Sequence, residues 1–362
     1  MNKILKLDWT ILFSVTFLLV IGLLVLYGVS LGENNIGLGN FKKQLISAFI
    51  GIILMFSIAF FDYRSLNFFS TKLYFVMLFV LFLVLFFGTK IRGTTGWVGI
   101  GAFHIQPVEI AKLVMVIFLA SFFSKKKSQM SIVVRIITSV VLVFIPIFLI
   151  IKQPDFGSAM IIIFSWSAML SISGISRKNL IALVLIGFIV SYSGWFVLRP
   201  YQKERLVSFV NPYNDPRGSG YNVIQSMVAV GSGGIFGKGL GHGSQSQLNF
   251  LPEKHTDFIF AVVAEELGFL GAFTVLLFLG LLFYRMKEIA RVASDNFGYL
   301  LAVGIMVMFF SQSLVNIGMN IGIMPVAGVP LPILSYGGSS LVAVLASIGV
   351  VQSVYVHRTK II

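Results

Sequence analysis

Long apolar runs separated by short polar segments form the dominant pattern of this chain. Runs of about 20 residues are long enough to cross the hydrocarbon core of a bilayer as helices. The pattern predicts an all-α polytopic membrane protein with about ten transmembrane helices, built as a single integral membrane domain over residues 1–362. The predicted spans are residues 9–29, 43–61, 73–89, 107–123, 132–151, 158–174, 179–198, 257–284, 298–318 and 336–356.

The distribution of lysine and arginine predicts how these spans are oriented. If the N-terminus lies inside, the basic residues gather in the loops on the side of both termini, and the short loops on the other side carry few. The positive-inside rule therefore places both termini in the cytoplasm. Residues 199–256, between the seventh and eighth spans, are predicted to form a large extracytoplasmic loop although they carry six cations, because long loops translocate regardless of charge. Those cations favour an anionic ligand or, equally, anionic lipid.

Composition agrees with a membrane protein and excludes several kinds of site. The chain is 57% hydrophobic, its mean hydropathy is +0.96, and its net charge of +14 is assigned to topology and to the long loop, so no nucleic-acid partner is expected. It has no cysteine, which excludes disulfides and thiolate metal sites. Its four histidines show no metal-ligand spacing.

Ionisable residues concentrate where the eighth span begins. Asp257 stands at the point where the chain enters the membrane, and Lys254 and His255 lie close to it in sequence. A carboxylate at such a depth usually has a partner or a function, because an unpaired charge is costly in hydrocarbon. Glu265 and Glu266 follow inside the span and are expected to be structural.

The fourth and sixth spans begin with further charged residues. Glu109 and Lys112 are three residues apart on the fourth span, so they share a helix face and are expected to pair. That pair either neutralises itself for insertion or forms part of a polar site. Asp155 either caps the sixth helix or holds a cation in place.

Two further segments place polar groups at the same end of the spans. Residues 221–236 predict an interfacial amphipathic helix with Val223, Met227 and Val230 on its apolar side and with Gln225 and Ser226 on the other. A proline-rich segment over 324–340, which contains Ser335 and Ser339, must re-enter at membrane depth without helical structure. A stripe of Gln312, Asn316 and Asn320 predicts hydrogen bonds between helices. Together these groups predict one chamber that opens outward.

At these residues the chain resembles the SEDS family (shape, elongation, division and sporulation proteins). The resemblance rests on segments in family order: Gln106-Pro-Val-Glu-Ile-Ala-Lys112, Gln153-Pro-Asp-Phe-Gly-Ser158, Ser246 through Ala261, Ala264-Glu-Glu-Leu-Gly268, and Gly328 through Ser339. Val108 departs from the usual serine, and Gly96 stands where relatives often carry a basic residue or serine before the tryptophan. The residues before Leu251 and the run Val329-Pro-Leu-Pro332 are closer to the elongation (RodA) branch than to the division (FtsW) branch.

The resemblance implies the SEDS fold and a peptidoglycan glycosyltransferase in the bacterial cytoplasmic membrane. Such proteins polymerise lipid II at the outer face of that membrane, with a class B penicillin-binding protein (a transpeptidase) and other elongation-complex proteins as partners. Asp257 matches the family's essential aspartate and is the expected catalytic base; it is alternatively a ligand of a divalent cation, Mg²⁺ or Mn²⁺. The other candidates for substrate binding are Glu109, Lys112, Asp155, Arg205, Gln225, Lys254, His255, Ser335 and Ser339.

Other functions remain open at this point. A flippase or transporter of lipid-linked precursors would also need a cavity and a basic rim, but the polar groups here gather at one face and no repeat is visible. A non-catalytic scaffold for the penicillin-binding protein, and a division or sporulation paralogue of the same family, are the remaining alternatives.

Overall fold

The computed structural model describes most of the chain. The described residues are 6–31, 34–91, 94–100, 103–125, 131–175, 220–248 and 250–358, with a few isolated positions between 178 and 212. Arg205 and nearly all of the predicted seventh span, 179–198, lie outside the described residues.

Nine helices of the described residues correspond to predicted spans. Eight of them are long and apolar enough to cross a membrane, and α6 is a shorter apolar helix. They are α1 (Trp9–Leu31), α2 (Asn34–Phe60), α3 (Arg64–Phe87), α4 (Pro107–Ser124), α5 (Ile132–Lys152), α6 (Phe156–Ile172), α11 (Ile259–Arg291), α12 (Asn296–Asn320) and α13 (Gly338–Val356). The prediction of a polytopic helical membrane protein is therefore confirmed.

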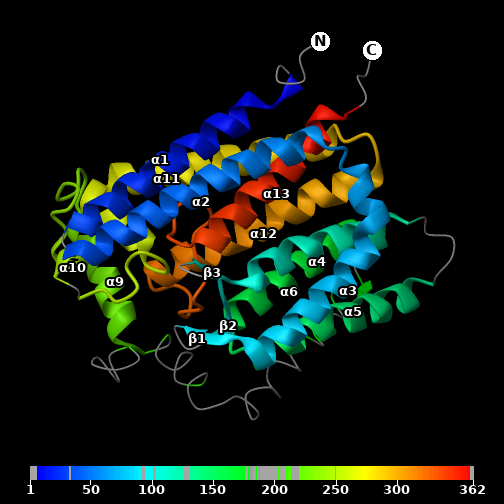
Figure 1. Cartoon of the computed structure of the whole chain (residues 1–362), viewed down its shortest axis with the longest axis horizontal. Coiled ribbons are helices and arrows are strands. Elements are labelled where there is room, and N and C mark those ends of the chain that lie inside the picture. Colours follow the sequence, from blue (N-terminus) through cyan, green and yellow to red (C-terminus); the bar gives the residue numbers. More distant parts are fainter. Residues whose placement is uncertain are drawn as a thin grey trace.

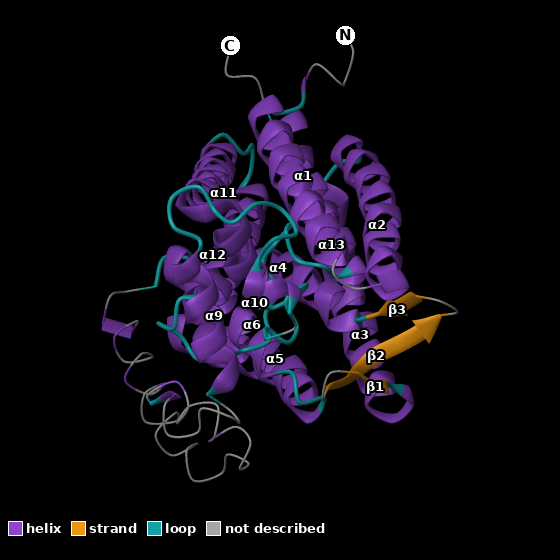
Figure 2. Cartoon of the chain, turned by 90° about the vertical axis from the view of Figure 1, so that its left-hand side faces the viewer, coloured by secondary structure: helices purple, strands orange, loops and turns teal. Residues whose placement is uncertain are grey.

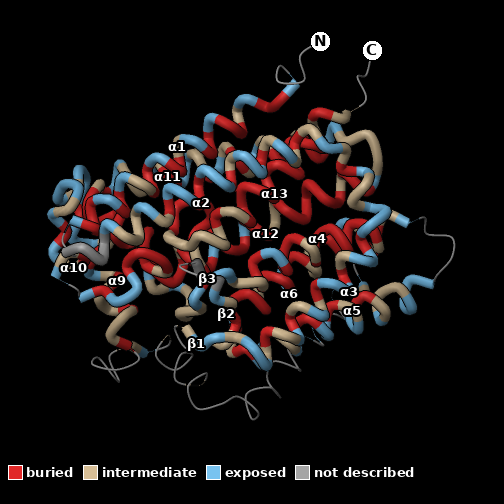
Figure 3. Tube along the Cα trace, viewed as in Figure 1, coloured by how far each residue is buried: buried red, intermediate tan, exposed pale blue. Residues whose placement is uncertain are grey.

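The helices run side by side, and both chain termini lie at one end of the bundle (Figures 1 and 2). Helices α12 and α13 form its centre: 72% and 78% of their most apolar windows are buried, compared with 28% for α3. Figure 3 shows the same contrast between the red centre and the paler outer helices. The outer face of α3 exposes Phe75, Phe79 and Phe86. A face so rich in exposed phenylalanine is suited to hydrocarbon rather than water.

A small antiparallel sheet at the opposite end of the bundle was not predicted. Its strands are β1 (Thr89–Ile91), β2 (Thr94–Ile100) and β3 (Phe103–Ile105), in the order β1-β2-β3. The hydropathy pattern predicts the end of a span and a short loop over these residues. The three strands are only three to seven residues long and glycine interrupts β2, so periodicity gave no clear strand signal.

Helix α11 is broken at Gly268, where the prediction had a continuous span. Gly268 has φ 67°, and a Cβ there would lie 2.3 Å from the backbone nitrogen of Gly237. The preceding loop fills the break: the Phe269 and Leu270 backbone N–H groups donate to the carbonyls of Gly234 and Ile235, at 2.8 and 3.2 Å. The helix therefore bends at a position where the carbonyls of the loop accept hydrogen bonds from N–H groups that lack a partner within the helix.

The predicted amphipathic helix exists, but its buried face was assigned wrongly. Helix α9 (Tyr221–Ser232) packs on α11 and α12, and it buries Val223, Ser226 and Ala229 rather than Met227 and Val230. The Ser226 hydroxyl donates to the carbonyl of Asn320 at 2.7 Å. A serine that hydrogen-bonds to backbone can occupy a buried face, so polarity alone misplaced it. A single turn, α10 (Ser244–Gln247), follows.

Candidate functional site

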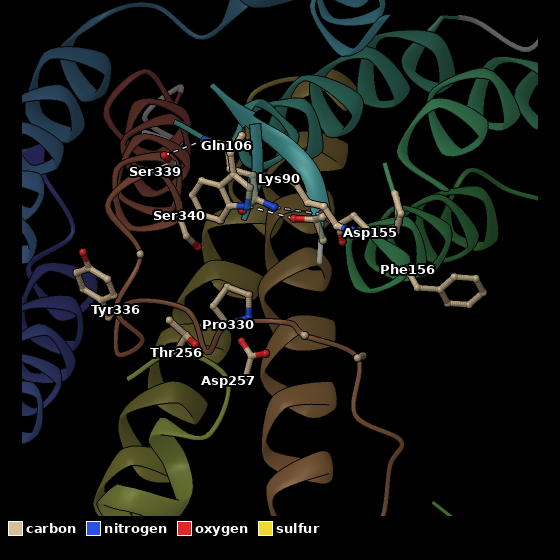
Figure 4. A pocket seen from close by; sticks show the side chains of 16 residues that line it. Lys90, Gln106, Asp155, Phe156, Thr256, Asp257, Pro330, Tyr336, Ser339 and Ser340 are labelled. Atoms are coloured by element: carbon tan, nitrogen blue, oxygen red, sulfur yellow. Dashed lines mark hydrogen bonds between the residues drawn. The ribbon is translucent and has the colours of Figure 1, made fainter. Parts of the chain in front are cut away.

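A cavity of about 430 Å³ lies at the end of the bundle opposite the termini (Figure 4). The sheet, the turn between α5 and α6, the starts of α4, α11 and α13, and the proline-rich segment all contribute to it. The residues that line it are Lys90, Thr94, Trp97, Gln106, Pro154, Asp155, Phe156, Thr256, Asp257, Ala327, Gly328, Pro330, Tyr336, Gly337, Ser339 and Ser340. The starts of these helices therefore lie together around one cavity.

Asp257 lies in the turn that precedes α11, and it is partly exposed to the cavity. Its backbone carbonyl accepts two hydrogen bonds of 2.9 Å, one each from the side-chain amides of Asn316 and Asn320. Both asparagines are fully buried in α12. The side-chain oxygen of Asn320 also accepts from the Ala261 N–H at 3.0 Å. The polar stripe on α12 therefore fixes the backbone that carries the Asp257 carboxylate.

Gly328 lies beside this carboxylate on the proline-rich segment. A Cβ on Gly328 would lie 3.6 Å from Asp257 Oδ2. The residue has φ 67°, a left-handed conformation that glycine adopts without strain. The backbone of this segment can thus turn close to the carboxylate without placing a side chain in the cavity.

Asp155 lies on another wall of the cavity, with Gln106 beside it. It caps α6: Oδ1 accepts from the Ser158 N–H at 3.0 Å, and Oδ2 accepts from the Ser158 hydroxyl at 2.9 Å. The Gln106 side chain donates to Oδ2 at 3.2 Å, and the Gln106 N–H donates to the Ser339 hydroxyl at 3.1 Å. Burial raises the pKa of Asp155, although the Ser158 hydrogen bonds and the nearby Lys112 charge oppose this. Asp155 thus joins the start of α6 to Gln106 before α4, and Gln106 in turn joins Ser339 of α13.

Glu109 and Lys112 form the predicted ion pair, with an Nζ–Oε1 distance of 2.8 Å. Both side chains are buried, at 4% and 2% exposure, and neither lines the cavity. A buried pair of this geometry is self-neutralising, because each charge supplies the partner that the other needs.

The remaining candidates lie behind the cavity wall. Lys254 is buried, and its Nζ donates to the Ser246 carbonyl at 2.6 Å. His255 is also buried, and its carbonyl accepts from the Tyr336 N–H at 2.8 Å. The Ser335 hydroxyl donates to the Thr256 carbonyl at 2.7 Å. Gln225, on α9, is also absent from the wall. Of the predicted substrate-binding residues that the structure describes, only Asp155 and Ser339 join Asp257 in lining the cavity.

Glu265 and Glu266 hold the loop that runs over the start of α11. Glu265 Oε1 accepts from Lys238 Nζ at 3.0 Å and from the Gln245 N–H at 2.8 Å, and Oε2 accepts from the Ser246 N–H at 3.1 Å. Glu266 is buried beside it. These contacts agree with the structural role that the sequence predicted.

Lys90, Thr94 and Trp97 are cavity residues that sequence reasoning missed. All three belong to the unpredicted sheet, at positions between the predicted spans 73–89 and 107–123. The indole N–H of Trp97 donates to the Thr94 hydroxyl at 3.1 Å. The sequence signal for them was the grouping of Lys90, Thr94 and Trp97 shortly before a helix that begins with charged residues.

A divalent cation in this cavity would need ligands from a substrate or from water as well as from the protein. Among the described residues, no group of three or more histidine, aspartate or glutamate side chains could form a cage of protein ligands. Mg²⁺ is commonly bound by one or two carboxylates together with substrate phosphates and waters. Asp257, which is partly exposed and lines the cavity, is a carboxylate that could take part in such a site.

Comparisons with known proteins agree with this architecture. A family model described as "Cell cycle protein" (FTSW_RODA_SPOVE) matches residues 8–360. The chain is 38% identical over 353 residues to the peptidoglycan glycosyltransferase MrdB of Escherichia coli K12, covering 97% of this chain and 94% of the relative.

Two solved structures show the same fold. One comes from work on "structural coordination of polymerization and crosslinking by a peptidoglycan synthase complex"; it has a TM-score of 0.81 and 33% identity, and covers 96% of this chain and 97% of the other. A mutant of the rod shape determining protein RodA of Thermus thermophilus has a TM-score of 0.74 and 28% identity, and covers 98% and 99% of the two chains.

Proposed function

The chain belongs to the FtsW/RodA/SpoVE family of cell cycle proteins, and from this premise we propose that it is a peptidoglycan glycosyltransferase. It is a multi-pass protein of the cytoplasmic membrane and polymerises lipid II into glycan strands. The observation that carries this function is the cavity around Asp257, which brings a partly exposed carboxylate to one end of the helical bundle in a chain of this family.

The active site faces the outside and both termini face the cytoplasm. Lysines and arginines of the short loops concentrate at the end where the termini lie, which supports a cytoplasmic location for that end. The cavity lies at the other end. Lipid II presented at the outer face of the membrane would meet the cavity directly.

Asp257 is the proposed general base of the reaction. The 4-hydroxyl of an acceptor GlcNAc attacks the anomeric carbon of a donor MurNAc, and its proton passes to the Asp257 carboxylate. The new C–O bond forms as the bond from the anomeric carbon to the diphosphate oxygen breaks, and undecaprenyl diphosphate leaves with the electron pair. An alcohol is a weak nucleophile, so a positioned base contributes about 10²–10⁴-fold to the rate. Asn316 and Asn320 would supply that positioning through the Asp257 carbonyl.

Mg²⁺ or Mn²⁺ is the proposed cofactor, with Asp257 as its protein ligand. When bound, it would neutralise negative charge on the diphosphate leaving group. The roles of Asp257 as general base and as metal ligand can be distinguished by testing whether added metal restores the activity of Asp257→Asn. A metal ligand changed to asparagine is rescued in part by higher metal concentration, whereas a lost base is not.

A class B penicillin-binding protein is the partner that cross-links the strands. Support comes from the structural neighbour, which was determined as a complex that coordinates polymerisation and cross-linking. We place the chain in the elongation machinery, together with the other elongation-complex proteins, because its proline-rich motif is closer to the RodA branch. A division or sporulation role is the alternative, and complementation of strains depleted of each paralogue would distinguish them.

Reconstitution separates polymerisation from lipid transport. Proteoliposomes would contain the chain, its partner with an inactivated transpeptidase serine, lipid II and Mg²⁺. Glycan strands on a gel are the expected result. Movement of lipid II across the bilayer without polymer would instead identify a flippase, and partner binding without either activity would identify a scaffold.

A further inference from the structure

A diphosphate in the cavity needs a cation, and neither Lys112 nor Lys254, the two candidate cations that the structure describes, lines its wall. Lys112 is buried in its ion pair with Glu109, and Lys254 is buried against the Ser246 carbonyl. Two carboxylates, those of Asp155 and Asp257, line the cavity. Apart from a lysine or arginine, the only charged side chains that an incoming diphosphate would meet among the described lining residues are these two carboxylates.

Lys90 is the only lysine or arginine among the described residues that lines this cavity. Its side chain is exposed, and it makes no hydrogen bond or ion pair within the described part of the chain. Figure 4 shows it on the same side of the view as Gln106 and Asp155, with Asp257 below. Its ammonium group is thus available to an anion that enters from outside.

The strand that carries Lys90 is paired irregularly at this residue. Thr89 pairs with Trp97, but Ile91 pairs with Thr94, so two residues of β2 face Lys90 alone. Regular alternation would put Lys90 and Trp97 on opposite faces of the sheet, yet both line the cavity. A bulge breaks that alternation and redirects side chains, and bulges are frequent beside active sites.

The bulge is anchored to the neighbouring cavity wall. The Thr95 N–H donates to the carbonyl of Gln153 at 3.3 Å. A Cβ on Gly96 would lie 3.1 Å from Gln153 Oε1, so a larger residue there would displace the Gln153 side chain. The irregular pairing is therefore held by the same turn that carries Asp155.

We propose that Lys90 binds the diphosphate of the lipid-linked donor. This inference rests on the proposed function for the identity of the substrate. An ammonium group forms charge-assisted hydrogen bonds with phosphate oxygens and acts as a point charge there. Placed on the sheet, Lys90 holds the donor's diphosphate at the edge of the cavity and offsets the charge that develops on the leaving group.

Direct binding tests this role without requiring catalysis. The purified chain in detergent would be titrated with undecaprenyl diphosphate and followed by native mass spectrometry. We would compare wild type with Lys90→Gln and Lys90→Arg. Lys152→Gln is the matched control, because Lys152 is also an exposed lysine near this end of the bundle but does not line the cavity.

The expected result is binding about tenfold weaker in Lys90→Gln, with Lys90→Arg and Lys152→Gln close to wild type. The affinity of wild type should also fall more steeply with added salt than that of Lys90→Gln. Equal affinity in wild type and Lys90→Gln would overturn the proposal and leave Lys90 only the role of protecting a sheet edge.

Failure of the proposed function would look different. If wild type binds the diphosphate lipid through Lys90 but forms no glycan strands, the binding site stands and the polymerase assignment does not. If wild type forms strands and Lys90→Gln shows an unchanged KM for lipid II, the polymerase stands and the role of Lys90 does not.

Discussion

Replacing Asn320 with leucine should remove one of the two amides that hold the Asp257 backbone while keeping the number and branching of the side-chain heavy atoms. Asn320 donates to the Asp257 carbonyl at 2.9 Å and accepts from the Ala261 N–H at 3.0 Å. Its amide also donates to the Asn316 carbonyl at 2.8 Å. Side-chain hydrogen bonds in helical membrane proteins contribute on average about 0.6 kcal/mol each and at most about 1.7, so losing three should lower stability by about 2–5 kcal/mol. A displacement of about 1 Å at the reacting groups can reduce the rate about 100-fold. We therefore expect kcat to fall about 10- to 100-fold, with little change in KM.

The assay measures initial rates of glycan polymerisation against lipid II concentration, together with thermal unfolding in detergent. Gln312→Met is the matched control, since Gln312 lies two turns away on the same buried stripe and makes no hydrogen bond to Asp257 among the described contacts. It should keep the kcat of wild type. A wild-type kcat in Asn320→Leu, or an equal loss in Gln312→Met, would refute the positioning role.

Two further changes test the fold around the site, both by thermal unfolding in detergent. Lys112→Met leaves buried Glu109 without its partner and should destabilise the protein by about 3–5 kcal/mol. The double variant Glu109→Gln/Lys112→Met should recover part of this loss, and equal stability of the single and double variants would contradict a self-neutralising pair. Gly268→Ala should destabilise the protein by about 1–3 kcal/mol because φ is 67° and the Cβ would meet the Gly237 backbone. Gly280→Ala, in the same helix with open space around it, should not, and equal behaviour of the two would argue against the break at Gly268.

Hydropathy predicted the helices well because each membrane-crossing helix must satisfy its own backbone within a long apolar run. The same pattern predicted that the polar groups lie at one end of the bundle, because successive spans cross the membrane in opposite directions. The pairing of Glu109 with Lys112 followed from helical spacing alone. These features depend on local sequence, and local sequence was sufficient for them.

The wall of the cavity depends on contacts between distant segments, which spacing does not reveal. Lys254 and His255 adjoin Asp257 in sequence, but the turn directs them into the protein rather than toward the cavity. Lys90 is far from Asp257 in sequence, and the short strand β1, paired irregularly with β2, brings it to the wall. Ser335 has the polarity of a ligand-binding residue, but its hydroxyl holds backbone instead.

Glycan polymerisation by wild type and Asp257→Asn, side by side in proteoliposomes with the partner protein, lipid II and Mg²⁺, tests the central claim most directly. Copurification of the partner with each variant shows that both are folded. We expect strands from wild type and none from Asp257→Asn, at any Mg²⁺ or Mn²⁺ concentration if Asp257 is the base. Strands from both proteins at similar rates would contradict the assignment of this cavity as the site of glycosyl transfer through Asp257.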